Sequence, residues 1–242
     1  MIAHRGLTLP DDTHAENTLA SVASALSAGA VYVESDCRVT RDGVVVLFHD
    51  DTVERVTGDP RPVADLTLRE LDALMEDRGG LLTLATALDG FPEARWNLDV
   101  KAAAAAEGVG RLVAPHAERV LVASFSDERR LAALAASADA GAEIRPATSA
   151  GRGAITRMLA ATSVGSARLA RRALDGIDAL QVPERSGRIR VLSDRLIRLA
   201  HDAGAEVHVW TVNDIERMRE LVARGVDGIV TDRADLALDA LG

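Results

Sequence analysis

The chain has 242 residues, of which 48% are hydrophobic and 27% charged, as in an ordinary soluble globular protein. Its formal net charge of -9 argues against nucleic acid as a main partner, because no basic surplus is present to neutralise phosphates. The single cysteine, Cys37, excludes an internal disulfide, and the sequence has neither a signal-peptide run nor an apolar stretch long enough to span a bilayer. We therefore expect a cytoplasmic protein without stable membrane insertion.

Short apolar runs alternate with longer helical segments along the whole chain. Strands are expected at residues 1–4, 31–36 with an extension at 44–49, 96–101, 119–123, 143–147, 179–182, 207–212 and 228–231. Helices are expected at residues 18–28, 67–73, 102–114, 127–138, 152–174, 194–203 and 214–223. Glycines of the kind that end helices precede the strands at Gly29, Gly141, Gly176, Gly204 and Gly225.

This alternation predicts an α/β protein with a single (β/α)8 barrel domain over residues 1–242. Eight strand-and-helix units at a typical size of about 250 residues are the pattern of that fold. A doubly wound open sheet is the competing architecture, but no glycine-rich dinucleotide fingerprint follows the first strand. The one sizeable irregular insertion, at residues 50–66, is expected to lie over the functional end of the barrel.

Two carboxylates, Glu34 and Asp36, lie two residues apart on the second predicted strand and therefore point to the same face. Flanking valines indicate a buried strand, and buried carboxylates side by side repel each other unless a cation lies between them. Hard divalent ions prefer such oxygen ligands, so the pair indicates a metal site. Cys37 should point to the opposite face as a small buried hydrophobe. His49 ends the next apolar run, where its ring can face a cleft.

Functional side chains of (β/α)8 barrels gather where the strands end. The ends of the predicted strands carry carboxylates, imidazoles, cations and one indole. Side chains of these kinds are typical of an active site rather than of a hydrophobic core. These strand-end residues are His4, Arg5, Glu34, Asp36, His49, Asp99, Lys101, Ser124, Gln181, Trp210 and Asp232.

Six short motifs in this order resemble those of the glycerophosphodiester phosphodiesterase family. The motifs are His4-Arg5-Gly6, Glu16-Asn17-Thr18, Glu34-Ser35-Asp36, His49-Asp50, Asp99-Val100-Lys101 and Trp210-Thr211-Val212-Asn213. The resemblance continues to Gly228-Ile229-Val230-Thr231-Asp232 and so covers essentially the whole chain.

The resemblance implies a metal-dependent hydrolysis of glycerophosphodiesters to glycerol 3-phosphate and an alcohol. A divalent metal, Mg2+ or Ca2+, would be held by Glu34, Asp36 and Asp99. Two histidines, His4 and His49, would carry out acid and base catalysis. Arg5 and Lys101 would bind the phosphate, Trp210 would form a wall of the substrate site, and Glu16 is a further contributor from the first loop. The implied partner is a small phosphodiester.

The chain departs from the family pattern at two positions. Ala15 stands where the family usually has proline before the Glu16-Asn17-Thr18 motif, which removes loop stiffness but no chemistry. Asp99 stands where many members have glutamate, and its shorter side chain implies a deeper metal or ligation through water. The related sphingomyelinase D type enzymes have aspartate at this position, so the change does not imply loss of function.

Several other interpretations of these residues remain open. Asp99 and Lys101 can form an internal salt bridge, Lys101 can be a Schiff-base lysine, and Trp210 can be core packing. The chain can also be a lysophospholipase D acting on lysolipids, which needs an apolar groove or a membrane-seeking loop at the barrel mouth. A non-catalytic barrel that binds phosphometabolites is the third possibility, although it would need cations more than an acid–base pair.

Overall fold

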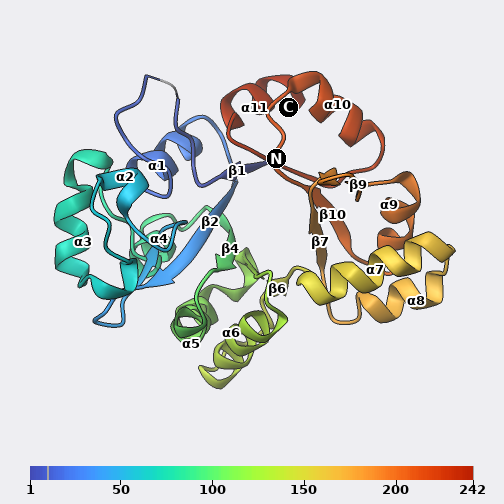
Figure 1. Cartoon of the computed structure of the whole chain (residues 1–242), viewed down its shortest axis with the longest axis horizontal. Helices are drawn as coiled ribbons and strands as arrows, with labels where there is room; N and C mark the ends of the chain where they lie inside the picture. Colours follow the sequence, from blue (N-terminus) through green and yellow to red (C-terminus); the bar gives the residue numbers. More distant parts are fainter. Residues whose placement is uncertain (10, 242) are drawn as a thin grey trace.

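The parallel strands of the computed structural model, which describes residues 1–9 and 11–241, are arranged around a nearly closed barrel (Figure 1). Within these residues the eight barrel strands are β1 (Ile2–His4), β2 (Tyr32–Val39), β4 (Arg95–Val100), β5 (Val120–Ala123), β6 (Ala147–Thr148), β7 (Ala179–Val182), β10 (Glu206–Val209) and β11 (Gly228–Thr231). Their order in the sheet is β6-β5-β4-β2-β1-β11-β10-β7. The predicted (β/α)8 barrel is therefore confirmed.

The two ends of this sheet meet between β6 and β7. The Ala150 amide donates to the Ala179 carbonyl at 2.8 Å, and the Asp178 amide donates to the Thr148 carbonyl at 2.9 Å. These bonds continue the parallel ladder across the seam. Because neighbouring strands of the barrel run parallel, the carboxyl ends of all eight strands meet at one rim.

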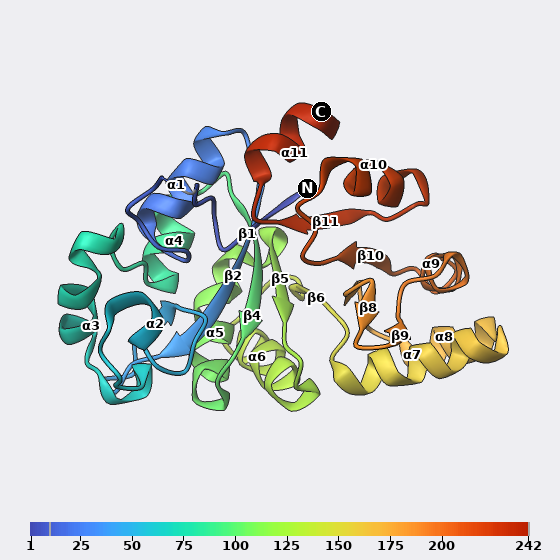
Figure 2. The same cartoon turned by 45° about the horizontal axis from the view of Figure 1, so that its top comes forward.

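Helices cover the outside of the barrel. They are α1 (Leu19–Ser27), α2 (Glu54–Thr57), α3 (Leu68–Met75), α4 (Leu84–Gly90), α5 (Ala106–Val113), α6 (Asp127–Asp139), α7 (Arg152–Val164), α8 (Ala167–Ala173), α9 (Asp194–His201), α10 (Ile215–Ala223) and α11 (Ala234–Leu241). Helices of the 3-10 type lie at Val63–Asp65, Glu76–Arg78, Ala103–Ala105 and Ala114–Arg119. Figure 2 shows the first half of the chain, blue to green, on one side and the second half, yellow to red, on the other.

A hairpin extends β2 beyond the barrel wall. The strand β3 (Val45–Leu47) pairs with β2 in antiparallel register, with Cys37 opposite Leu47. Gly43 forms the turn at a φ of +82°, a conformation that side chains disfavour. The Phe48 amide then donates to the Asp36 carbonyl at 2.8 Å, which returns the chain to the rim directly before His49.

The core between sheet and helices is aliphatic, as the scarcity of aromatic residues requires. Its largest fully buried side chain is Trp96 of β4, and Cys37 is fully buried among valines and leucines, as expected. No helix in the described part of the chain is both long and apolar enough to cross a bilayer.

Three local predictions were wrong or incomplete. The strand expected at 143–147 is only the two-residue β6, because Pro146 has no amide to donate to a ladder. The helix expected at 152–174 is divided into α7 and α8 by Gly165, which has a φ of +67°, and α8 begins with Ser166 as its N-cap. The segment 50–66, expected to be irregular, contains α2 and a 3-10 helix.

Two helices and one hairpin were not predicted. These are α4, α11 and the short hairpin of β8 (Arg185–Ser186) and β9 (Ile189–Arg190). The helix α4 has an N-cap signal in Thr83, whose hydroxyl accepts from the Thr86 amide, but its seven residues are too few for a clear apolar period.

Candidate active site

A pocket of about 170 Å³ lies at the carboxyl ends of the barrel strands. Eight of the nine predicted site residues line it: His4, Arg5, Glu34, Asp36, His49, Asp99, Lys101 and Trp210. The ninth, Glu16, lies behind Arg5, which it holds through a hydrogen bond of 2.8 Å between its Oε1 and the guanidinium. The fold thus brings together residues that are as far apart in sequence as His4 and Trp210.

Asp36 is the most enclosed carboxylate of this pocket, with 1% of the residue exposed. The Lys101 Nζ lies 3.0 Å from its Oδ1 and 2.6 Å from the Asp99 Oδ2. The Arg5 Nε lies 3.1 Å from its Oδ2. Burial acts to raise the pKa of Asp36, but the charges of Lys101 and Arg5 outweigh it and hold that pKa below its usual value.

Asn17 fixes the orientation of this carboxylate. Its side-chain amide donates to the Asp36 Oδ2 at 2.9 Å, and its carbonyl oxygen accepts from the Ser35 hydroxyl at 2.5 Å. Both Asn17 and Arg5 have positive φ values, +59° and +57°, and the Asn17 amide donates to the Arg5 carbonyl at 2.9 Å. Strained backbone of this kind persists only where surrounding contacts impose it. The sequence interpretation of the Glu16-Asn17-Thr18 motif had overlooked this role of Asn17.

Glu34 differs from Asp36 because part of its carboxylate is unsatisfied. Its Oε2 is buried without a hydrogen-bond partner and lies 3.9 Å from the His4 Nε2. Burial, and then the negative charges of Asp36 and Asp99, raise the pKa of Glu34 well above its usual value. Asn97, which is opposite Glu34 in the β2–β4 register, also has a buried side-chain oxygen without a partner.

The carboxylate oxygens of Glu34, Asp36 and Asp99 are the possible ligands of a divalent cation in this site. In residues 1–9 and 11–241, no three or more His, Cys, Asp or Glu side chains are already grouped as a metal site. One reason is that the Lys101 ammonium lies between Asp36 and Asp99. The unpartnered Glu34 oxygen nevertheless needs a positive charge or a proton, and three carboxylates outnumber the two cations beside them. The donor set is therefore chemically suited to a hard cation.

The two histidines have the same arrangement, His4 at the end of β1 and His49 in the loop after β3. The His4 Nδ1 lies 2.5 Å from the Asp232 Oδ1, and the His49 Nδ1 lies 2.7 Å from the Asp50 Oδ1. Ionised carboxylates only accept hydrogen bonds, so each Nδ1 carries the proton and each Nε2 is left for other partners. The hydrogen bond from His4 is the largest cause that lowers the pKa of Asp232.

Further contacts hold each of these carboxylates. The Asn213 side chain donates to the Asp232 Oδ2 at 2.8 Å, and the Arg55 Nε donates to the Asp50 Oδ2 at 2.6 Å. Arg55 also donates to the Glu16 Oε1 at 2.6 Å, which connects α2 to the first loop. Each imidazole is thus held in a fixed orientation through its Nδ1, which leaves its Nε2 for another partner.

Two aromatic rings form one wall of the pocket. Trp210 follows β10, and Phe125 follows β5; their ring centroids are 6.0 Å apart and the planes meet at 83°. Phe125 had not been predicted as a site residue, although it directly follows Ser124 at a strand end. With only three Phe, two Trp and one Tyr in the chain, two aromatics at one rim are not explained by core packing.

Comparison with known proteins shows the family to which the chain belongs. The model of the family described as "Glycerophosphoryl diester phosphodiesterase family" matches residues 4–236. The chain belongs to this family. The prediction made from the six motifs is therefore confirmed, and with it the enzyme class of a glycerophosphodiester phosphodiesterase.

Individual relatives agree with this assignment. The chain is 38% identical over 247 residues to a Mycobacterium tuberculosis protein named "Probable glycerophosphodiester phosphodiesterase 2", covering 99% of this chain and 89% of that protein. A glycerophosphodiester phosphodiesterase structure from Agrobacterium tumefaciens has a TM-score of 0.74 and 25% identity, over 99% of this chain and 97% of that one. An Oleispira antarctica phosphodiesterase, solved with its product sn-glycerol-3-phosphate, has a TM-score of 0.72 and 22% identity, over 99% and 95% of the two chains.

Proposed function

We propose that the chain hydrolyses glycerophosphodiesters to glycerol 3-phosphate and an alcohol, with His4 and His49 as acid and base. The observation that carries this proposal is the pair of imidazoles, each held at Nδ1 by a carboxylate, in the pocket that also contains Lys101 and Arg5. The product complex of the Oleispira antarctica relative supports glycerol 3-phosphate as the product.

In this proposal Arg5 and Lys101 bind the phosphodiester. A phosphodiester is anionic and repels nucleophiles, so positive charge beside it lowers the barrier, and does so more as charge develops in the transition state. The Asp36 and Asp99 carboxylates fix the position of the Lys101 ammonium, and Glu16 fixes that of the Arg5 guanidinium.

A divalent metal, Mg2+ or Ca2+, would be held by Glu34, Asp36 and Asp99. When bound, it would supply positive charge to the phosphate oxygens as a Lewis acid. The unpartnered Glu34 Oε2 supports this assignment, because it is a buried oxygen donor that lines the pocket without a protein partner.

The two imidazoles carry the proton transfers. One Nε2 accepts the proton of the attacking hydroxyl, and the other protonates the oxygen of the leaving alcohol, so that charge does not accumulate on either group. The attacking group is the neighbouring glycerol hydroxyl, which gives a cyclic phosphate that water then opens. Because one histidine must be neutral and the other protonated, the pH–rate profile is expected to be bell-shaped.

The residues of the sequence alone left two other functions open. A lysophospholipase D would prefer lysolipids, and a binding protein would retain phosphometabolites without turnover. Both histidines favour an enzyme over a binding protein, because phosphate binding needs cations but no acid–base pair.

The test measures glycerol 3-phosphate release from glycerophosphoglycerol and glycerophosphocholine, beside cleavage of a lysolipid. We expect turnover of the glycerophosphodiesters that EDTA abolishes and that Mg2+ or Ca2+ restores. Faster cleavage of the lysolipid would favour the lysophospholipase D, and binding of glycerol 3-phosphate without any turnover would favour the binding protein. Full activity in EDTA would contradict the metal assignment.

A further inference from the structure

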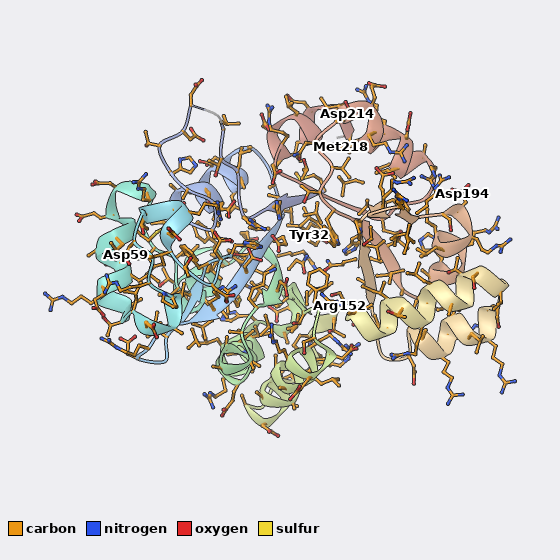
Figure 3. The ribbon with its side chains drawn as sticks, in the orientation of Figure 1. Tyr32, Asp59, Arg152, Asp194, Asp214 and Met218 are labelled. Atoms are coloured by element: carbon orange, nitrogen blue, oxygen red, sulfur yellow. The ribbon has the colours of Figure 1, made fainter. Side chains whose placement is uncertain are left out.

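Arg152 is an exposed cation beside the pocket that the proposed chemistry does not use. It is the first residue of α7 and follows the N-cap Gly151 in the short connection from β6, and Figure 3 shows it at the end of α7 nearest the strands. Among residues 1–9 and 11–241, no carboxylate lies within ion-pairing distance of its guanidinium, and no hydrogen bond from its side chain is present. Its charge is therefore available to a ligand.

Phe125 connects this guanidinium to the site. The Arg152 Cζ lies 5.8 Å from the Phe125 ring centroid, and the Lys101 Nζ lies 5.9 Å from the same point. The two positive charges are therefore at most about 12 Å apart. Phe125, Lys101 and Trp210 all line the pocket, so a group bound at Lys101 and extending along the aromatic wall comes close to Arg152.

The part of the barrel rim that follows β7, next to Arg152, is also positively charged. The β8–β9 hairpin follows β7 and carries Arg185, Arg188 and Arg190, all exposed. In the described part of the chain none of these three forms an ion pair, whereas Arg5 and Arg55 near the first strands are each bound to carboxylates. The rim after β6 and β7 is thus locally positive in a chain whose net charge is -9.

We propose that Arg152 selects glycerophosphodiesters whose leaving alcohol carries a second anionic group, a phosphate or a carboxylate. This inference rests on the proposed function. The glycerol arm of every such diester is neutral, so only the alcohol can present a charge to the rim. An arginine binds carboxylates and phosphates through two parallel hydrogen bonds.

The same geometry disfavours a cationic alcohol such as choline. Aromatic faces usually attract quaternary ammonium groups, but the Phe125 ring already has two cations within 6 Å of its centroid. A third positive charge at this position would be repelled by both. The aromatic wall therefore supports the neutral part of the alcohol and Arg152 binds its anionic end.

The experiment compares kcat/KM for three diesters of one series: glycerophosphocholine, glycerophosphoglycerol, and glycerophosphoglycerol with a phosphate on its far hydroxyl. We expect the wild type to prefer the phosphorylated diester over the choline diester by about tenfold, since one charge-assisted contact is worth about 1.4 kcal/mol or more. Arg152→Gln should remove most of this preference, Arg152→Glu should invert it, and added salt should weaken it.

Arg172→Gln is the matched control, because Arg172 is an exposed arginine near the end of α8 that also lacks an ion pair in residues 1–9 and 11–241. It removes the same charge and should leave the preference unchanged. If wild type and Arg152→Gln cleave the three diesters with the same ratios of kcat/KM, or if the wild type prefers the choline diester, the role of Arg152 is overturned. The proposed function would still stand in either case. Absence of cleavage even of glycerophosphoglycerol, whose leaving alcohol is neutral, would instead overturn the proposed function and this inference with it.

Discussion

Asp232, at the end of the last barrel strand, contacts His4 at the end of the first strand. It follows β11, its Oδ1 lies 2.5 Å from the His4 Nδ1, and Asn213 holds its other oxygen at 2.8 Å. The sequence placed Asp232 at a strand end but assigned it no role. Its position beside His4 depends on the pairing of β1 with β11, which no local pattern indicates.

Replacing Asp232 by asparagine is expected to impair catalysis more than binding. An amide can present either a donor or an acceptor to the His4 Nδ1 and no longer stabilises a protonated imidazole. We expect Asp232→Asn to lower kcat about 100-fold with little change in KM, and to move one limb of the pH–rate profile. Steady-state kinetics over a pH series measures both effects.

Asp227→Asn is the control for this variant. The Asp227 Oδ2 lies 2.8 Å from the His201 Nε2, so it makes a similar aspartate–histidine contact, but neither residue lines the pocket. Its kcat should stay within about threefold of the wild type. A kcat for Asp232→Asn as high as that of the control would show that Asp232 does not position His4.

Residue patterns predicted the titratable groups better than the groups that hold them. His4, Glu34, Asp36 and Lys101 were found because short motifs and strand-end positions mark them. Asn17, Asp50 and Phe125 were not assigned, because their roles depend on contacts between segments that are distant or follow a turn. Asparagine tolerates a positive φ better than most residues, but no local pattern indicates that Asn17 adopts one.

At the scale of elements, α5 and α6 pack closely at Gly110. A Cβ added there would lie 2.7 Å from the Ala136 Cβ and 2.9 Å from the Ser137 amide nitrogen. No flexible side-chain end can move aside to accommodate these contacts. The small residues of the two helices thus permit a close contact that larger side chains would prevent.

We expect Gly110→Ala to destabilise the protein by about 2 kcal/mol, although alanine is the better helix former. Urea unfolding measures this difference. Gly90→Ala, at the end of α4, is the control, because a Cβ there meets nothing within 4 Å. Its free energy of unfolding should be unchanged or slightly higher, and equal stabilities for the two variants would refute the packing argument.

An ion pair between Glu184, directly before β8, and Arg217 of α10 connects the β8–β9 hairpin to α10. The Arg217 Nε lies 3.0 Å from each oxygen of Glu184, and the Glu184 carbonyl accepts from the amides of Val191 and Leu192. The hydrogen bond from Arg217 is the largest cause that lowers the pKa of Glu184. The unfolded chain therefore binds a proton at Glu184 more readily than the folded protein does.

This difference gives a pH-dependent prediction. The contribution of Glu184 to stability is present above its unfolded pKa of about 4.3 and is lost as the pH falls through its folded pKa. Glu184→Gln should cost on the order of 1 kcal/mol at pH 7, since the pair is partly exposed, and almost nothing at the acidic end of a pH series of unfolding curves. Glu216→Gln, in an exposed pair within α10, is the control and should have little effect at either end. A loss for Glu184→Gln that persists unchanged into acid would contradict the assignment.

At the scale of the whole molecule, the site exists because the barrel closes. In the β1–β2 register His4 is opposite Glu34. The strand β1 also pairs with β11, and this pairing brings Asp232 into contact with His4 although the two are 228 residues apart in the sequence. The alternation of strands and helices predicted this architecture, because eight such units have few other arrangements. It did not predict the seam between β6 and β7, where two residues of β6 and backbone bonds around Ala150 complete the sheet.

The central claim is that two histidines from distant segments act as one acid–base pair on a glycerophosphodiester. The most direct measurement is glycerol 3-phosphate release by wild type, His4→Ala, His49→Ala and the double variant, with thermal unfolding as a check on folding. We predict that each single variant lowers kcat by about 10²- to 10⁴-fold and that the double variant is little worse than either, as for groups that act together. Folded single variants that retain activity within tenfold of the wild type would contradict the account.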